Sequence, residues 1–422
     1  MRKLPKLLLS LLGSLLGLLI LIAVGTVLYV NATWDSPVRR PAANLVAPSD
    51  EVSLARGRHL YTLTANCWGC HGGKGGLAPD EPQTGGREFD LTGIGPGFGF
   101  YYASNLTPDR DTGIGAWTDG ELVRAIREGI NRRNQIIFPV MAYQFYHGLS
   151  DADALAIVAY MKSLPPVRNQ VPSRRLSFPT KALIALGILR PEPPVTTEVQ
   201  APRKGATAEY GKYLAWHASG CAECHSPRAA RDGSLDMTRP LAGGLFPFPE
   251  ENLEMTGSNL TPDPATGIGS WSEAQFMKAM RSGTRPDGRV LVTFMPWPLY
   301  THWSDDELRA AWLYMRSLPP QMHEVPRGKL KDAAAGAAGA ARGRALFEVY
   351  CLMCHGREGR GSPLFDVVLQ DFVAGADPDR IVDVVLHPSG NNNSAMPAYD
   401  KTLSRDQVSD IISYLKQTGE RQ

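Results

Sequence analysis

The chain has few of the residues that a metal centre or a nucleic-acid interface would require. It contains six cysteines and nine histidines among 422 residues, and its formal net charge is only +2. A charge so close to balance gives no sign of nucleic-acid binding, which usually shows as a strong basic excess. A zinc site would need two further ligands for each CxxC pair, from a neighbouring CxxC or an HxxxH, and neither is present. The chain also lacks a GxGxxG motif opening a βαβ unit, so nothing indicates a flavin site of its own.

All six cysteines fall in three Cys-x-x-Cys-His motifs, and this spacing is the attachment signature of c-type haem. Two thiols add to the haem vinyl groups, and the adjacent histidine is placed to ligate the iron. A redox-active CxxC would not need the histidine, and disulfides are a weaker alternative because haem attachment consumes the thiols. Chance placement of histidine after all three pairs has odds on the order of one in 10⁵. We therefore expect three haems c, with covalent bonds to Cys67, Cys70, Cys221, Cys224, Cys351 and Cys354 and with His71, His225 and His355 as iron ligands.

An uncharged stretch of 24 residues runs from Leu7 to Val30 near the N-terminus. As a helix it would be roughly 36 Å long, which is enough to cross a hydrocarbon core of about 30 Å. Basic residues precede the stretch and no small-x-small cleavage site follows it, so an uncleaved anchor is favoured over a cleaved signal peptide. We expect a single anchor in the bacterial inner membrane and haem domains in the periplasm, where c-type haems are attached.

An internal repeat at a constant offset of 154 residues relates the first two haem segments. Ser104–Asp109 falls on Ser258–Asp263, and Ser163–Pro166 falls on Ser317–Pro320. The third copy is shorter and lacks these loops, but it keeps the haem motif and a closing helix. The sequence therefore predicts two equivalent domains followed by a divergent one.

Each copy is predicted to pair a helix before its haem motif with an amphipathic helix at its end. The first helices are expected at Val52–Thr64, Glu209–Ala218 and Ala340–Tyr350, and each contains a glycine that indicates close approach by another element. This is the all-α plan of small class I cytochrome c domains, here three in tandem after a transmembrane helix. The expected ranges are 1–35 for the anchor, 48–168, 206–322 and 339–422 for the three domains, and 169–205 and 323–338 for the linkers.

The first linker contains an apolar segment, Leu176–Leu189, that is too short to span a bilayer. We expect it to pack across the first two haem domains. Contact with the membrane or with a partner protein is the alternative.

The second iron ligand of each haem is expected to be a methionine. His147 becomes Thr301 at the offset of 154, which argues against paired histidines in the first two domains. Met161 and Met315 are expected to be core residues, because the third copy has Leu415 at that position of its closing helix. The best set is Met141, Met295 and Met396; Met141 is weaker because Ala142 follows it where the others have proline, and His387 is a minor alternative in the third domain.

The loops Asn105–Asp109 and Thr112–Trp117, together with their repeats, resemble those of a known family. They are similar to the trihaem cytochrome c subunits of bacterial membrane-bound dehydrogenases, which include quinoprotein alcohol dehydrogenases, flavin-dependent gluconate dehydrogenases and molybdenum aldehyde dehydrogenases. The resemblance covers nearly the whole exported part. The alanine after Met141 departs from the family, which usually has Met-Pro there, and many relatives have a cleavable signal.

The resemblance implies an electron relay. A separate catalytic subunit of quinoprotein, flavoprotein or molybdenum type would oxidise an alcohol or aldehyde, and electrons would pass to ubiquinone or a terminal oxidase. This chain would have no catalytic residues and no substrate-oxidising site of its own. Asn105, Trp117, Asn259 and Trp271 are candidates for the haem surroundings, or they simply form a repeated turn. The rival functions are a stand-alone carrier between respiratory complexes and a haem enzyme with one open iron site.

Overall fold

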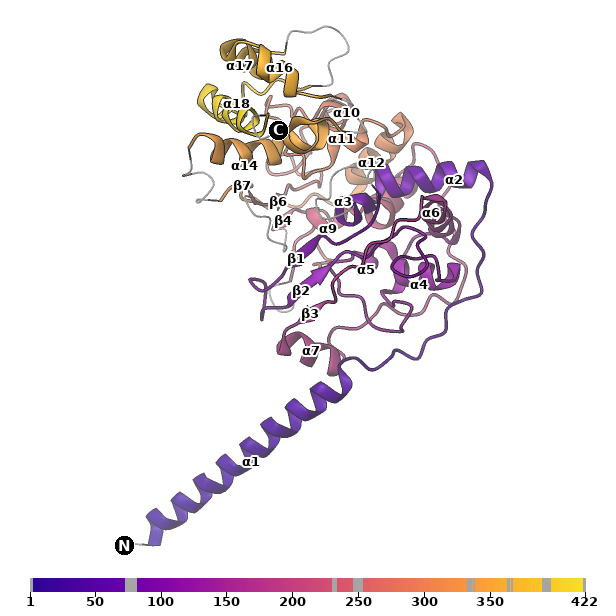
Figure 1. Ribbon diagram of the computed structural model, residues 1–422, viewed down its shortest axis with the longest axis vertical. Helices are drawn as coiled ribbons and strands as arrows, with labels where there is room; N and C mark the ends of the chain where they lie inside the picture. The colour runs from indigo at the N-terminus through magenta and orange to yellow at the C-terminus, as the bar shows by residue number, and fades with distance from the viewer. Residues whose placement is uncertain are drawn as a thin grey trace.

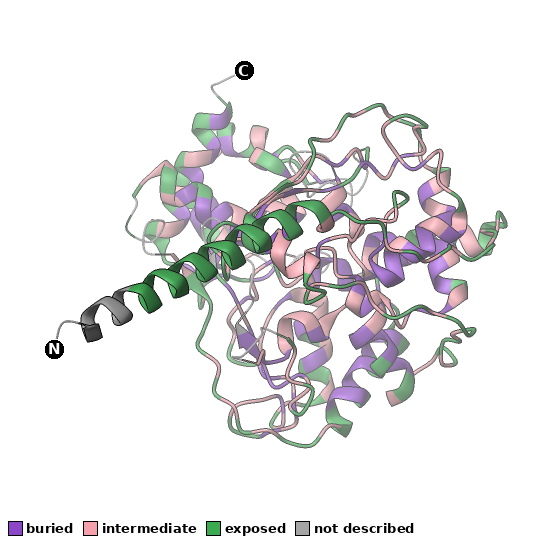
Figure 2. Cartoon of the chain, turned by 90° about the horizontal axis from the view of Figure 1, so that it is seen from below, coloured by how far each residue is buried: buried purple, intermediate pink, exposed green. Residues whose placement is uncertain are grey.

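One long helix stands apart from a body of short helices joined by long loops (Figure 1). The computed structural model describes residues 3–72, 82–229, 234–245, 253–331, 336, 338–362, 365, 367–388 and 396–419. The long helix, α1, spans Lys3–Thr33, and an 18-residue window within Ser10–Thr33 has a mean hydropathy of 2.6 and no residue buried inside the protein. By length and composition this helix can cross a membrane, and in Figure 2 its described residues carry almost entirely the colour of exposed positions.

Three helix pairs form the cores of the three repeats. They are α2 (Glu51–Arg58) with α6 (Asp151–Ser163), α8 (Ala208–Tyr213) with α12 (Asp305–Ser317), and α14 (Ala340–Tyr350) with α18 (Arg405–Gly419). A Cβ added to Gly57, Gly211 or Gly343 would lie only 2.0, 1.9 or 1.9 Å from a carbonyl oxygen of the partner helix. The predicted close approach at the glycines is confirmed, since no larger residue fits at these crossings.

The remaining helices surround these pairs, and the first two repeats carry equivalent sets. In each of these repeats the first helix continues into a π-helical turn, which the sequence did not predict. The first repeat has η1 (His59–Thr64), α3 (Cys67–His71), α4 (Asp119–Glu128) and α5 (Tyr143–Tyr146); the second has η2 (Leu214–Ala218), α9 (Cys221–His225), α10 (Glu273–Ser282) and α11 (Trp297–Tyr300). The third has α15 (Leu352–His355), η3 (Arg357–Gly359), α16 (Gln370–Gly375) and α17 (Pro378–Leu386).

Side-chain caps explain where several of these helices begin. Ser150 accepts a hydrogen bond from the Asp153 N–H at the start of α6. Ser304 and Glu307 form a reciprocal capping box at the start of α12. These local signals satisfy N–H groups that a helix cannot satisfy by itself.

Short strands make the all-α expectation incomplete. β1 (Glu88–Asp90) and β2 (Gly99–Tyr102) pair antiparallel, and β2 pairs in turn with β3 (Arg175–Leu176) from the first linker. Two further pairs join β4 (Gly244–Leu245) to β6 (Thr256–Gly257) and β5 (Leu253–Glu254) to β7 (Lys329–Leu330). The fold is therefore mostly helical, with small sheets in which β2 with β3 and β5 with β7 join segments more than 70 residues apart.

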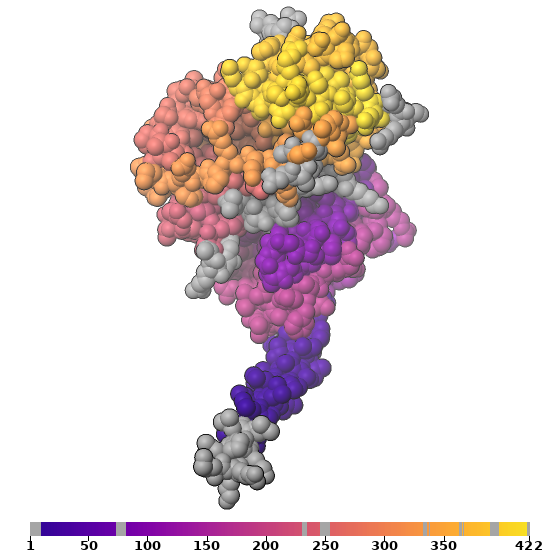
Figure 3. Space-filling model, turned by 90° about the vertical axis from the view of Figure 1, so that its left-hand side faces the viewer, coloured from indigo at the N-terminus to yellow at the C-terminus, as the bar shows by residue number. Residues whose placement is uncertain are grey.

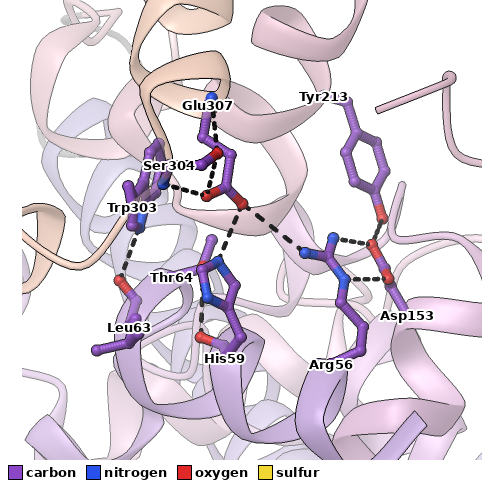
Figure 4. A network of polar contacts seen from close by, with 9 residues as sticks. All are labelled: Arg56, His59, Leu63, Thr64, Asp153, Tyr213, Trp303, Ser304 and Glu307. Atoms are coloured by element: carbon purple, nitrogen blue, oxygen red, sulfur yellow. Dashed lines mark hydrogen bonds and ion pairs between the residues drawn. The ribbon is translucent and has the colours of Figure 1, made fainter. Parts of the chain in front are cut away.

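The first two repeats pack against each other through equivalent surfaces (Figure 4). His59 of the first repeat contacts the Glu307 carboxylate of the second at 3.0 Å, while Tyr213 of the second donates to the Asp153 carboxylate of the first at 2.8 Å. An offset of 154 residues relates His59 to Tyr213 and Asp153 to Glu307, so the two contacts exchange as in a twofold interface. Helix packing follows the same symmetry: α5 of the first repeat packs on η2 of the second, and α11 of the second repeat packs on η1 of the first.

Arg56 links the two halves of this interface. Its guanidinium binds the Asp153 carboxylate through two hydrogen bonds of 2.8 Å and lies 3.9 Å from Glu307. Trp303 of the second repeat adds a hydrogen bond from its indole N–H to the Leu63 carbonyl at 3.1 Å. The charged side chains are mostly withdrawn from water, and removing one partner from such a network leaves an uncompensated buried charge. The network therefore fixes the first two repeats relative to each other.

The third repeat docks on the second, at the end of the body opposite α1 (Figure 3). Thr293, which is 3% exposed, donates its N–H and its hydroxyl to the Val349 carbonyl at 2.9 and 3.0 Å. The equivalent of Thr293 in the first repeat is Pro139, which has neither group and cannot form this contact. The docking is therefore specific to the second repeat.

The apolar segment of the first linker forms α7 (Phe178–Ala185), which packs beside the end of α1. Leu176 and Leu189, at the two ends of this segment, pack on a cluster of the first repeat that contains Tyr101 and Phe138. The sequence predicts packing across two haem domains; the contacts of this segment instead lie with α1 and with the first repeat.

Candidate haem-binding sites

Each Cys-x-x-Cys-His motif forms a single helical turn. In the first two repeats this turn is α3 or α9, and it follows a residue with positive φ, Asn66 at 51° and Gly220 at 65°. Residues at positions i, i+3 and i+4 of a helix lie on one face, so both thiols and the imidazole are presented on the same side. In the third repeat Cys351 directly precedes the equivalent turn, α15.

The three motif histidines are oriented by backbone carbonyls. Nδ1 of His71 lies 2.7 Å from the Ser104 oxygen, and Nδ1 of His225 lies 2.8 Å from the equivalent Ser258 oxygen. In the third repeat Nδ1 of His355 lies 3.3 Å from a backbone oxygen. A carbonyl can only accept, so Nδ1 carries the proton and Nε2 keeps its lone pair for a metal.

Burial lowers the pKa of all three motif imidazoles, although the carbonyl bonds act in the opposite direction. They are therefore neutral at neutral pH, which is the form that ligates iron.

A continuous cavity of about 2720 Å³ joins the motifs of the first two repeats. Its wall includes both cysteines, the motif histidine and the candidate methionine of each repeat, namely Cys67, Cys70, His71 and Met141, and Cys221, Cys224, His225 and Met295. A pocket for one small molecule usually measures about 300–1,000 Å³. The space therefore suits more than one large cofactor.

Polar groups without a partner in the cavity wall test the fit of a haem more directly. The Tyr101 hydroxyl is buried and has no hydrogen-bond partner among the described residues, and burial raises its pKa. Oδ1 of Asn66, just before the first motif, is also buried and unpartnered within the described part of the chain. Both residues line the cavity. Unpaired buried polar groups are costly, so their presence here fits a cofactor with a polar edge.

The two candidate methionines of the repeated domains occupy the same turn. The carbonyls of Met141 and Met295 accept hydrogen bonds from the N–H groups of Tyr143 and Trp297 at 2.7 and 2.6 Å. Ala142 has φ −70° and ψ 38°, which is close to the φ −77° and ψ 44° of Pro296. The alanine after Met141 therefore preserves the turn that proline forms in the second repeat, although ligation by either methionine stays a prediction.

Met161 and Met315 also border the cavity, but they do so from the closing helices. Both are nearly buried, at 3% and 4% exposure. Their position agrees with the predicted role as core residues beneath a cofactor.

The third candidate site is described in part. Met396 is half-buried against the core of the third repeat, and Tyr399, three residues later, donates to the Tyr350 carbonyl next to Cys351 at 3.1 Å. The segment that carries Met396 thus lies close to the motif. His387, the minor alternative, is exposed at the end of α17.

Asn105 and Asn259 border the cavity, but their amides are fully used in hydrogen bonds to other groups of the chain. Asn105 donates to Thr112 and to the Val167 carbonyl, and it accepts from the N–H and hydroxyl of Thr107. Asn259 makes the equivalent four bonds. An amide has two donors and two acceptor positions. This geometry favours the repeated-turn interpretation over a direct bond to haem.

The two tryptophans of these loops differ. Trp117 borders the cavity, whereas Trp271 lies under the Arg285 guanidinium at 5.7 Å from the ring centre.

Sequence reasoning missed Tyr101 as a residue of the first site. The repeat gave no signal for it, because its equivalent in the second repeat is Met255.

Two protein families match parts of the chain. The cytochrome c family matches residues 54–165, and the family described as cytochrome C oxidase, cbb3-type, subunit III matches residues 338–415.

Several relatives match most of the chain. It is 30% identical over 400 residues to the cytochrome c subunit of the quinone alcohol dehydrogenase of Gluconobacter oxydans (strain 621H), which covers 87% of this chain and 79% of the relative. It is 27% identical over 395 residues to the gluconate 2-dehydrogenase cytochrome c subunit of Pantoea cypripedii, covering 87% and 86%. The fructose dehydrogenase cytochrome subunit of Gluconobacter japonicus is 23% identical over 430 residues, covering 89% of this chain and 81% of the relative.

Proposed function

Because the chain belongs to the family of dehydrogenase cytochrome c subunits, we propose that it relays electrons through three covalent haems c from a catalytic subunit to the respiratory chain. The observation that carries the proposal is the cavity that joins the first two motifs. The histidines of these motifs bond to backbone carbonyls through Nδ1, so Nε2 is available to ligate iron. The catalytic partner would oxidise an alcohol, a sugar acid or a similar substrate, as the names of the relatives indicate. Ubiquinone is the proposed acceptor, with a terminal oxidase as the alternative.

Three domains would each hold one haem. The proposed domains are residues 48–168, 206–322 and 339–422, and each contains one motif and one helix pair that crosses at a glycine. Family matches at residues 54–165 and 338–415 support the first and third domains, and the offset of 154 extends the first assignment to the second.

The residues that would hold the haems are those of the predicted set. Six cysteine sulfurs would bind covalently, and Nε2 of His71, His225 and His355 would each ligate an iron. The thioether sulfurs of Met141, Met295 and Met396 would be the second side-chain ligands. Haem supplies one-electron redox chemistry at its iron, and a thioether ligand raises the reduction potential relative to a second histidine. If histidine and methionine side chains both ligate each iron, they would keep oxygen and peroxide from the metal.

Helix α1 would keep the haem domains at the membrane. Its apolar part is long enough to span a bilayer, and basic residues precede it, which favours a cytoplasmic N-terminus and domains in the periplasm. A quinone dissolved in the membrane would then lie within reach of the relay.

Purification of the full chain from bacterial membranes tests the proposal. The holoprotein mass should show three haems, and alanine replacement of both cysteines of one motif should remove one haem each time. A dehydrogenase subunit should co-purify and should reduce the haems when its substrate is added. A high-spin haem that binds carbon monoxide would instead indicate an enzyme, and a chain that purifies without any partner would indicate a stand-alone carrier.

A further inference from the structure

Helix α7 exposes apolar side chains that the protein does not cover. Phe178 is 42% exposed, and Leu186 and Ile188, just after the helix, are 61% and 63% exposed. The other side of the helix is fixed to the first repeat, because the fully buried Thr180 donates its hydroxyl to the Phe98 carbonyl at 2.8 Å. The exposed side chains are thus held in place by a well-anchored helix.

The position of α7 along α1 indicates which environment the exposed apolar side chains face. Tyr29, in the last turns of α1, donates its hydroxyl to the Ala185 carbonyl at 3.4 Å. Trp34 follows the end of α1, and Nζ of Lys181 lies over its ring at 5.0 Å. Tyrosine and tryptophan typically mark the boundary between lipid and water. The C-terminal end of α7 therefore lies at the level where α1 leaves the bilayer (Figure 1).

Basic side chains surround the same position. Lys181 and Arg174 both lie against Trp34, and Arg174 pairs with Asp35 at 3.0 Å. Asp35 also accepts a hydrogen bond from the turn at residues 131–135, which carries the exposed Arg133. Three basic side chains therefore surround one acid, Asp35, and this excess of positive charge would attract anionic lipid headgroups.

We propose that residues 176–190, with α7 at their centre, lie in the surface of the bilayer and contact anionic phospholipid. The apolar side chains enter the lipid beside α1, and the lysine and arginines meet the headgroups, as in interfacial amphipathic helices. This inference rests on the proposed membrane anchoring by α1.

The contact would fix the orientation of the first haem site. Leu176 and Leu189 pack in one cluster with Phe138 and Val140, which directly precede Met141. The loop that carries Met141, the predicted ligand of the first site, therefore packs against the segment 176–190 that we propose to lie in the membrane surface. The equivalent loop of the second site is instead hydrogen-bonded to the third repeat through Thr293.

Spin labels in the full-length holoprotein test the inference, after reconstitution into vesicles of phosphatidylcholine with phosphatidylglycerol. A nitroxide attached to Leu186→Cys reports depth through its accessibility to oxygen and to a water-soluble nickel complex. Val46→Cys, 79% exposed on the body, is the control for water, and Leu21→Cys, in the middle of α1, is the control for lipid. An unchanged haem spectrum in each variant confirms folding.

We expect the label at Leu186 to be as poorly accessible to the nickel complex as the label at Leu21. Its accessibility to nickel should be several-fold lower than that of the label at Val46. Lys181→Glu should reduce this protection in vesicles that contain phosphatidylglycerol, whereas Lys212→Glu, on the exposed side of α8, should not. A lipid-exposed Leu21 with a water-exposed Leu186 would overturn this inference alone. Nickel access at Leu21 would overturn the anchor as well, and protection of Leu186 only in the presence of a dehydrogenase subunit would assign the surface to that partner.

Discussion

Glu307 serves two purposes at the contact between the first two repeats, and only one depends on its charge. One carboxylate oxygen accepts from the N–H and hydroxyl of Ser304 at 2.9 and 3.1 Å, which caps α12. The other oxygen faces His59 at 3.0 Å and Arg56 at 3.9 Å. Glutamine is also compatible with a capping box, so Glu307→Gln retains the cap and removes the charge. The substitution therefore isolates the ionic part of the contact.

The pKa of Glu307 sets the size of the effect. Burial raises this pKa, but the hydrogen bond and charge of His59 and the bonds from Ser304 outweigh burial and bring the pKa from 4.5 to about 2. A tenfold change in an acid constant corresponds to about 1.4 kcal/mol, so the charged form contributes at most about 3 kcal/mol to stability. Because folding lowers the pKa, this contribution is fully present above pH 4.5 and is lost as the pH falls toward 2.

Denaturant unfolding of the detergent-solubilised protein, followed by circular dichroism at several pH values between about 2.5 and 6, measures the difference. Glu273→Gln is the matched control, since Glu273 lies in the first turn of α10 and pairs with Arg309 at 2.7 Å in an exposed position. The control should change stability by less than about 0.5 kcal/mol at every pH. If Glu307→Gln were no more costly than the control, or if its cost did not shrink in acid, the ionic contact would not stabilise the interface.

Three further substitutions test the helix crossings, the iron ligands and the repeated loops. Gly211→Ala places a methyl group 1.9 Å from a carbonyl oxygen of α12 and should cost about 1–3 kcal/mol in thermal unfolding, whereas Gly375→Ala meets no atom within 4 Å and should be tolerated. Met295→Ala should abolish one Met–iron charge-transfer absorption and lower one haem potential, while Met315→Leu should leave both unchanged; unaltered potentials in Met295→Ala would remove this residue from the ligand set. Asn259→Ala should cost about 1–3 kcal/mol, because it leaves buried groups unsatisfied, with no change in the haem spectra. A spectral shift at unchanged stability would instead place this side chain against a haem.

Prediction from the sequence succeeded where the signal was local or repeated. The helix expected at Val52–Thr64 is present as α2 and η1, and the one expected at Ala340–Tyr350 is α14. The glycine of each first helix predicted a close approach, and the structure identifies the closing helix as the partner. A glycine inside a predicted helix is a signal at a single position, so one sequence is enough to predict the close approach, although not the partner.

The sequence failed where the determining contact joins distant segments. β2 pairs with β1 and also with residues 175–176, more than 70 residues further along the chain, and no local pattern marks these strands. Tyr101 lies in β2 and lines the cavity, and its buried hydroxyl has no hydrogen-bond partner among the described residues. Backbone geometry alone showed that Ala142 adopts the conformation of Pro296, so the turn after Met141 is kept, while ligation by Met141 stays a prediction.

The sequence by itself determined the three Cys-x-x-Cys-His motifs of this protein and its division into two equivalent repeats and a third. Attachment chemistry depends on the spacing of thiols and imidazole along one helical turn, which the sequence states directly. Only the tertiary structure decided how the repeats meet. The first two repeats are joined by pairs of equivalent contacts, and the third is hydrogen-bonded to the loop before Met295. It also decided that the apolar linker segment lies beside α1. These arrangements depend on complementary surfaces formed by residues far apart in the chain, and such surfaces exist only once the chain has folded.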